Sequence, residues 1–172
     1  MKLKDPGWAR RLPGKFVMAV ATLGPLGRNL PAPGTWGSAA GLLYVMAFFY
    51  RASWIPTVLI SIVVCYLAVG FTGEAARRMG REDPGEVNLD EFVVMPFVFL
   101  GWHAGYTATW PIWLVLAAGF ALFRLFDILK PLGISRLQKL PGGWGIVVDD
   151  IAAAFAACVT LQAVAWLLRG KL

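Results

Sequence analysis

Acids, histidine and cysteine are all scarce in this chain of 172 residues. It contains ten Asp and Glu, one His and two Cys, against sixteen Lys and Arg. Cys65 and Cys158 both lie inside apolar runs, so the sequence offers neither a disulfide framework nor a paired-cysteine zinc motif. The single histidine, His103, is expected to be an interfacial residue and not a catalyst. A functional site in this chain is therefore expected to be built from side chains other than His and Cys.

Apolar residues are abundant instead. The chain is 58% hydrophobic with a mean hydropathy of +0.65, well above a typical soluble domain. Eight Trp and eleven Phe, several of them near segment ends, fit the aromatic belts of a bilayer protein. The net charge of +6 comes without any motif that reads RNA or DNA, so no nucleic-acid partner is expected. The partner that composition indicates is the lipid bilayer.

Runs without a charged residue locate the helices. They cover residues 29–50, 52–73, 92–123 and 151–168, and a spanning helix needs about 20 apolar residues. Proline and glycine interrupt the first and third runs, so helices are predicted at 38–50, 55–72, 92–102, 111–129 and 146–168. The short apolar stretch 16–23 follows basic residues, but it is too short for the core of a cleaved signal peptide.

The predicted fold is all-α: one domain, 1–172, forming a polytopic membrane helical bundle with about five helical segments, some short or half-spanning. Residues 1–32 would be a cytoplasmic N-terminal segment and 33–168 the bundle. With the N-terminus inside and five crossings, thirteen of the sixteen Lys and Arg fall on the inner side, leaving only Arg51, Arg169 and Lys171 outside. The alternative architecture is a compact helical domain in which only some helices span.

Five of the ten acids stand where apolar segments meet the inner side: Asp90, Glu91, Asp127, Asp149 and Asp150. Ionisable groups at membrane depth are costly, which favours a functional role. A helix dipole stabilises an acid by only about 0.3–1 kcal/mol, too little for the adjacent pair on the last helix. A bound cation would relieve their repulsion. We predict Glu91, Asp127, Asp149 and Asp150 as catalytic metal ligands, with Asp90 as a helix cap or a support behind the ligands.

Basic side chains accompany these acids. Arg124, Asp127 and Lys130 recur at intervals of three on one helix face, and Pro131 favours a helix end at Lys130. A self-neutralising ladder is the structural alternative, but a phosphoryl group requires cationic clamps beside carboxylate-held Mg²⁺. The glycine-bearing segments 33–38 and 142–145 either present N–H groups to an anion or form capped turns. The candidate substrate-binding residues are Arg124, Lys130, Thr35 and Ser38.

Missing motifs exclude other phosphatase chemistries. Neither cysteine begins a Cys-x5-Arg nucleophile loop, because Phe71 and Val164 stand where the arginine is required. Enzymes that form a phosphohistidine need more than one His. The chain has no Asp-x-Asp pair of the haloacid-dehalogenase type and no Gly-x-x-x-x-Gly-Lys-Ser/Thr loop. Among phosphatase chemistries, this leaves metal-assisted hydrolysis by a carboxylate cluster.

Four blocks of sequence, in their order and spacing, resemble the phosphatidylglycerophosphatase A family of bacterial membrane enzymes over about residues 16 to 165. The blocks are Pro-Gly-Thr-Trp-Gly-Ser at 33–38, Asp-Pro at 83–84 followed by Asp-Glu-Phe at 90–92, Phe-Arg-Leu-Phe-Asp-Ile-Leu-Lys-Pro at 123–131, and Gly-Gly-Trp-Gly-Ile-Val-Val-Asp-Asp at 142–150. Two positions depart from the family: Pro141 stands where members often have His, and Asn88 stands where a β-branched residue is common, which we interpret as a packing difference. Glu74 matches no acid of the family and is not placed in the site.

The resemblance implies a Mg²⁺-dependent phosphatase that converts phosphatidylglycerophosphate to phosphatidylglycerol and phosphate at the cytoplasmic face of the bacterial inner membrane. Two alternatives stay open on the residues alone: a cation-coupled membrane transporter, or a non-catalytic membrane subunit whose acids bridge to Arg and Lys. Transport sites usually lie near the bilayer midplane on broken helices, whereas these acids gather at one interface. The sequence carries no signal for the number of subunits.

Overall fold

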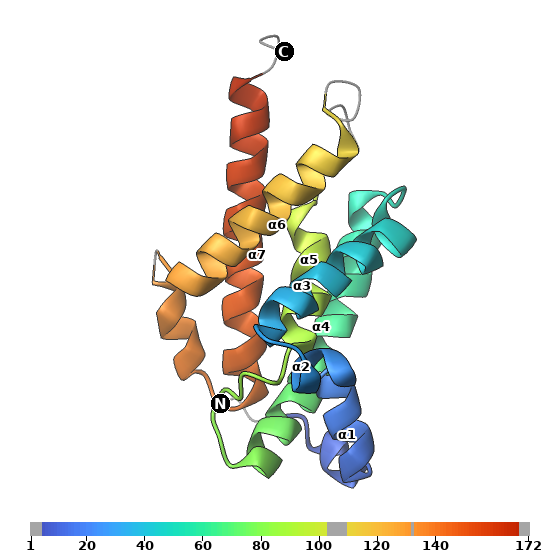
Figure 1. Ribbon diagram of the computed structural model, residues 1–172, viewed down its shortest axis with the longest axis vertical. Coiled ribbons are helices and arrows are strands. Elements are labelled where there is room, and N and C mark those ends of the chain that lie inside the picture. The colour runs from blue at the N-terminus through green and yellow to red at the C-terminus, as the bar shows by residue number, and fades with distance from the viewer. Residues whose placement is uncertain (1–4, 103–109, 132, 169–172) are drawn as a thin grey trace.

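The computed structural model describes residues 5–102, 110–131 and 133–168, and all regular structure within them is helical (Figure 1). The main helices are α3 (Pro33–Tyr44), α4 (Trp54–Met79), α5 (Leu89–Val98), α6 (Ile112–Leu129) and α7 (Gly143–Leu167). The shorter elements are the 3-10 helix η1 (Gly7–Arg11), α1 (Gly14–Ala21), α2 (Pro25–Asn29), the π-helical turn η2 (Val45–Phe49) and the 3-10 helix η4 (Ile134–Lys139). The predicted all-α membrane bundle with five main segments is confirmed. His103, Arg169 and Lys171 lie outside the described residues.

The short helix α5 lies at the centre of the bundle, packed against α3, α4 and α7 (Figure 1). Its side chains Val93, Val94, Met95, Phe97 and Val98 are all buried. Because protein covers α5 on several sides, this helix does not need the length of a lipid-facing span. It starts at Leu89, before the predicted 92, so both of its acids lie in the first helical turn.

Small residues bring α3 directly against α5. A side-chain carbon at Gly37 would lie 2.6 Å from the Asn88 carbonyl oxygen, and one at Gly41 would lie 2.9 Å from that of Phe92. Such close approach of two helices requires residues without bulk at the contact. The prediction that α3 begins near residue 38 was wrong: it begins at Pro33, because proline is favoured in the first turn of a helix.

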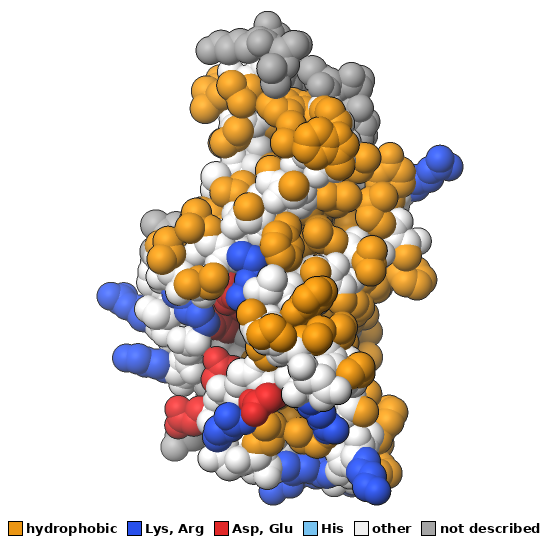
Figure 2. Space-filling model, viewed as in Figure 1, with side chains coloured by type: hydrophobic (Ala, Val, Ile, Leu, Met, Phe, Trp, Pro, Cys, Tyr) orange, Lys and Arg blue, Asp and Glu red, His pale blue; other side chains and the backbone are white. Residues whose placement is uncertain are grey.

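Three helices, α4, α6 and α7, are long and apolar enough to cross a membrane. The helices α3 and α5 are shorter, in agreement with the prediction of short segments. On α4, the side chains of Ile55, Leu59, Ile62 and Val63 are each more than half exposed, as befits a surface that faces lipid. Figure 2 shows that hydrophobic side chains dominate the upper part of the molecule, while most charged side chains gather at the lower end. We call this lower end, where α5 and α7 begin, the site end.

The N-terminal segment, predicted only as cytoplasmic, forms η1 and α1, which pack on α4, and α2, which packs on α3. Val17 and Ala21 of α1 join a small core with Ala75 and Val87. Arg78 donates a hydrogen bond to the Leu12 carbonyl oxygen at 3.0 Å.

The buried acid Glu74 lies on α4 and pairs with Arg78, the residue that also holds the N-terminal segment. It accepts hydrogen bonds from Arg77 at 2.7 Å and from Arg78 at 2.5 Å. Its charge is therefore balanced within α4, which gives Glu74 a structural role.

The carboxylate of Asp5 caps α7. It accepts a hydrogen bond from the Gly143 N–H at 3.0 Å, and a side-chain carbon at Gly142, whose φ is +56°, would overlap this carboxylate. An acid at a helix N-terminus is stabilised by the free N–H groups and by the helix dipole. The segment 142–145 was expected either to present N–H groups to an anion or to form a capped turn, and in the structure the Gly143 N–H binds the chain's own Asp5.

We expect Asp5→Ala to lower the free energy of unfolding by about 1 kcal/mol, because α7 loses its cap. Asp5→Asn should cost less, since Asn caps a helix about as well as Asp. Thermal unfolding of the purified protein in detergent compares the two variants. Unchanged stability of Asp5→Ala would show that this contact does not hold the start of α7.

Candidate metal centre and phosphate site

Five carboxylates converge at the site end from three helices. Asp90 and Glu91 stand in the first turn of α5, Asp127 in the last turn of α6, and Asp149 and Asp150 in the second turn of α7. Asp90, Asp149 and Asp150 are only 7%, 2% and 3% exposed. The side chains of Glu91 and Asp127 are each 12% exposed. Acids separated by up to 60 positions in sequence thus share one buried environment.

Asp90, Glu91 and Asp150 form the tightest group, each offering an oxygen within 4.8 Å of the others. Of the two roles predicted for Asp90, a helix cap or a support behind the ligands, the cap was wrong. Asn88 occupies the N-cap position, and its side chain makes no capping hydrogen bond. Because α5 starts at Leu89, Asp90 is the second helical residue, and its carboxylate joins the other two acids.

Several carboxylate oxygens in the cluster are buried without a hydrogen-bond partner among the described residues. They are Oδ1 of Asp90, Oε2 of Glu91, Oδ1 of Asp149 and Oδ2 of Asp150. Leaving buried charges uncompensated costs several kcal/mol per ion. A hard divalent cation, which prefers carboxylate oxygens, would satisfy them together. The donor set therefore fits Mg²⁺.

The acids of α5 titrate abnormally in this environment. Burial, reinforced by the charge of Asp127, raises the pKa of Glu91 to about 7. Burial, together with the charge of Glu91, also raises the pKa of Asp90 well above its ordinary value. Both groups would ionise far more readily beside a bound cation.

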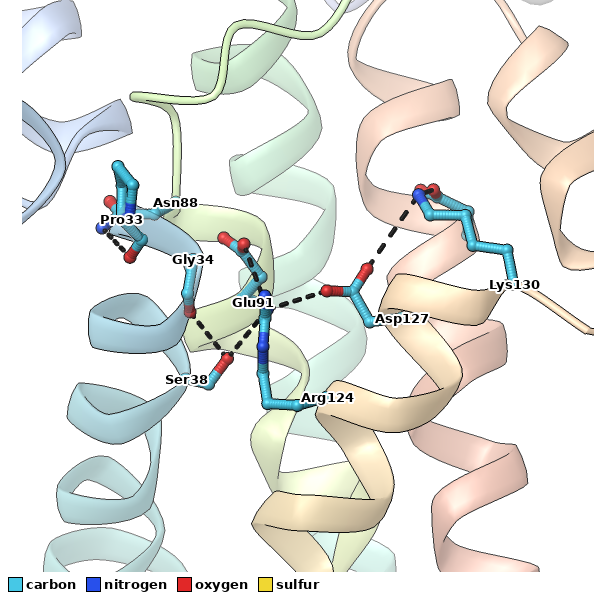
Figure 3. A network of polar contacts seen from close by, with 9 residues as sticks. Pro33, Gly34, Ser38, Asn88, Glu91, Arg124, Asp127 and Lys130 are labelled. Carbon is cyan, nitrogen blue, oxygen red and sulfur yellow. Dashed lines mark hydrogen bonds and ion pairs between the residues drawn. The ribbon is translucent and has the colours of Figure 1, made fainter. Parts of the chain in front are cut away.

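Arg124 joins three helices at the edge of the cluster (Figure 3). Its Nη1 lies 2.7 Å from Asp127 Oδ2, 3.5 Å from Glu91 Oε1 and 3.5 Å from the Ser38 hydroxyl oxygen. Ser38 in turn donates its hydroxyl proton to the Gly34 carbonyl oxygen at 2.8 Å. The start of α3, the start of α5 and the end of α6 are thereby held in one polar network.

Helix α6 ends at the C-cap residue Lys130, as predicted from Pro131. Lys130 has a left-handed backbone conformation with φ of +42°. This conformation costs on the order of 1–2 kcal/mol for a residue with a side chain. It directs the amine to Asp149, with which Lys130 forms an ion pair, and to within 4.0 Å of Asp127. Burial alone would lower the pKa of Lys130, but Asp149 raises it above its ordinary value, so the amine is charged.

A cavity of about 340 Å³ lies over the cluster, lined by its acids, Lys130, Asp83 and Gln138. Figure 2 shows acidic side chains in a recess of this face with basic side chains around it. Asp83 lies in a sequence block that matches the family, but no role in the site was predicted for it. The sequence carries no signal for Gln138. Both come from connecting segments whose position depends on how the helices pack.

The predicted substrate-binding residues differ in their surroundings. Arg124, Lys130 and Ser38 lie in the network described above. Thr35 is exposed on the first turn of α3, and its role stays a prediction. The roles of Asp127 and Asp149 as metal ligands likewise stay predictions, since both pair with the basic residues and lie outside the tightest group of three.

Gly34 is expected to be essential for the position of Glu91. A side-chain carbon at Gly34 would overlap Glu91 Oε1 and lie 3.1 Å from Arg124 Nη1. Gly34→Ala should therefore displace the carboxylate and lower activity roughly tenfold or more, with little loss of stability. Gly7→Ala, where a side-chain carbon meets nothing within 4 Å, is the control. Normal activity of Gly34→Ala would show that this close approach has no functional importance.

Fold and site together define a helical membrane protein with a buried carboxylate centre flanked by Arg and Lys at one end. The sequence model of the family described as phosphatidylglycerophosphatase A matches residues 19–165. The chain belongs to this family.

Known relatives agree with this assignment. A phosphatidylglycerophosphatase A of Haemophilus influenzae is 39% identical over 80% of this chain and 82% of its own length. That of Escherichia coli is 34% identical over 70% of this chain and 67% of its own length. A Bacteroides thetaiotaomicron protein, whose name suggests a phosphatidylinositol-3-phosphatase, is 30% identical over 80% of this chain and 86% of its own length. No solved structure matches the chain at a significant level.

Proposed function

We propose that this protein hydrolyses the phosphomonoester of phosphatidylglycerophosphate, releasing phosphatidylglycerol and inorganic phosphate. Membership of the family and the relatives named for this activity support the substrate. The observation that carries the chemistry is the group of Asp90, Glu91 and Asp150, buried beside Arg124 and Lys130. A phosphoryl group needs both a carboxylate-held cation and cationic clamps, and this arrangement offers both.

Asp90, Glu91 and Asp150 would hold Mg²⁺, with Asp127 and Asp149 beside them. When bound, the ion would neutralise charge on the phosphate and acidify a water. Adding Asp90 to the predicted ligands Glu91, Asp127, Asp149 and Asp150 is the main change that the geometry makes to the sequence-based proposal. The buried Oδ1 of Asp90, which has no hydrogen-bond partner within the described part of the chain, supports this addition.

Arg124 and Lys130 would bind the phosphate oxygens. The guanidinium of Arg124 offers a planar fork suited to two oxygens, and the amine of Lys130 acts as a point charge. Asp127 orients Arg124, and Asp149 orients Lys130, through the contacts already described. These pairs hold the cations in place before substrate arrives, which reduces the entropy lost on binding.

The site end would face the cytoplasm. Most Lys and Arg fall on that side in the predicted topology, as the positive-inside rule requires. A cysteine replacing the exposed Glu82 should then react with a membrane-impermeant thiol reagent only from the cytoplasmic side, and one replacing the exposed Arg51 only from the opposite side. Labelling of both cysteines from the same side would contradict this orientation.

The position of the acids disfavours the transporter alternative. The cluster occupies the first turn of α5, the last turn of α6 and the second turn of α7, so it lies near the ends of these helices and not at their middles. Transport sites usually lie near the bilayer midplane on interrupted helices. The geometry therefore supports an interfacial enzyme.

Phosphate release by the purified protein from three substrates tests the proposal. These are phosphatidylglycerophosphate, phosphatidylinositol 3-phosphate and a soluble phosphomonoester, each assayed with Mg²⁺ and with a chelator. We expect the first lipid to be hydrolysed fastest, and the reaction to stop when the metal is removed. Faster hydrolysis of the inositol lipid would reassign the substrate, and hydrolysis that persists in the chelator would contradict the metal's role.

A further inference from the structure

The N-terminal segment carries more positive charge than nearby acids balance, because the one acid close to it in the sequence is Asp5, whose charge interacts with that of Arg10. Between Asp5 and Glu74 the chain contains no Asp or Glu. Its basic residues Arg10, Arg11, Lys15 and Arg28 are exposed. The ion pairs found in the described parts of the chain involve other cations. These four charges are therefore available to an external anionic partner.

The same segment packs on α4 near the point where the uncharged part of this helix ends. The rings of Trp8 and Phe16 make edge-to-face contacts with Phe71 of α4, at centroid distances of 5.2 and 5.9 Å. The uncharged part of α4 ends just beyond Phe71, before Glu74. From the start of α4 to this point a helix extends about 30 Å, the thickness of the hydrocarbon core. Phe71, and with it α1, lies near the edge of that core.

We propose that Arg10, Arg11, Lys15 and Arg28, together with Phe16, form a basic surface that binds negatively charged phospholipid headgroups. The chemistry is complementary, since anionic lipids attract clusters of Lys and Arg beside a membrane. Phe16 is 51% exposed beside these charges, so its ring is available to enter the interface. Helices α1 and α2 lead directly into α3, whose first turn contacts the cluster. Anionic lipids bound here would lie beside the site.

A quadruple variant with Arg10→Gln, Arg11→Gln, Lys15→Gln and Arg28→Gln tests this surface. The control carries Arg51→Gln and Arg136→Gln, two exposed cations outside the basic surface, and it is matched in charge to the double variant Arg11→Gln with Lys15→Gln. Each protein in detergent is titrated with phosphatidylserine or with phosphatidylcholine. Phosphatidylserine is anionic but has no phosphomonoester, so it is neither substrate nor product of the proposed reaction. Native mass spectrometry counts the bound lipids, and thermal unfolding reports stabilisation.

We expect the wild type and the control to prefer phosphatidylserine, and the quadruple variant to bind it on the order of several hundredfold more weakly, at roughly fivefold for each of the four charges. About 0.5 M salt should remove the preference from the wild type. The double variant Arg11→Gln with Lys15→Gln should be intermediate. Because binding is measured without turnover, the result is independent of the proposed enzymatic function. Equal binding of the two lipids by the wild type, or undiminished phosphatidylserine binding by the quadruple variant, would overturn the proposal.

Discussion

Replacing Asp90 or Asp150 by Asn is expected to lower Mg²⁺-dependent phosphate release by about a hundredfold or more. Asn keeps the shape of Asp but removes the charge, and Mg²⁺ depends on carboxylate oxygens. Mutation of a residue that only supports a metal ligand typically lowers metal affinity or activity by about 10–100-fold. Loss of a ligand itself should therefore lower activity by at least as much. Both side chains are buried, and each has an oxygen without a partner among the described residues.

The variant Asp90→Asn distinguishes a metal ligand from a helix cap. If Asp90 were a helix cap, Asn would replace it with little effect, since the two residues cap equally well. Glu82→Gln, an exposed acid outside the cluster, is the matched control. Activity should be measured across a range of Mg²⁺ concentrations, because high Mg²⁺ should restore part of it if affinity is the main loss. Near-normal activity of both Asn variants in folded protein would show that these acids hold no catalytic metal.

Arg124→Lys should lower kcat/KM by roughly a hundredfold, although the charge is kept. Arg124 contacts Asp127, Glu91 and Ser38 through one nitrogen, and its planar group can also present an edge to phosphate oxygens. A lysine amine cannot meet both demands. The dependence on Mg²⁺ concentration should be nearly unchanged, because the tightest acid group is intact.

The control for this variant is Arg136→Lys, at an exposed position on η4. It should have normal activity, which shows that the effect is specific to the site. If Arg124→Lys is as active as the wild type, the fork geometry is unimportant and a simple positive charge suffices at this position.

The helical segments were predictable because their signals are local. Uncharged runs marked α4, α6 and α7, and the proline at position 131 marked the end of α6 at Lys130. The concentration of acids at one end was likewise visible from where charges interrupt apolar segments. Helix starts were less well predicted: α3 begins at Pro33, where proline favours a first helical turn, and α5 begins at Leu89, three residues before the predicted start.

The grouping of side chains depends on tertiary packing and was only partly predictable. The role of Asp90 changed because a helix start at Leu89 leaves the cap position to Asn88. Asn88, a departure from the family, is buried and donates a hydrogen bond to the Pro33 carbonyl oxygen at 3.0 Å. Asp5 carried no sequence signal, because its partner Gly143 is distant in the chain. Gln138 carried none either, because its place in the cavity lining depends on how the helices pack.

The central claim is that Asp90, Glu91 and Asp150 hold the catalytic cation. Crystals of the protein grown with Mn²⁺ in place of Mg²⁺ test it most directly, through an anomalous difference map. We expect a peak within coordination distance, about 2–2.5 Å, of oxygens from all three carboxylates, and we expect this peak to disappear in Asp150→Asn. A map in which Mn²⁺ binds elsewhere, with no peak among these three acids, would contradict it.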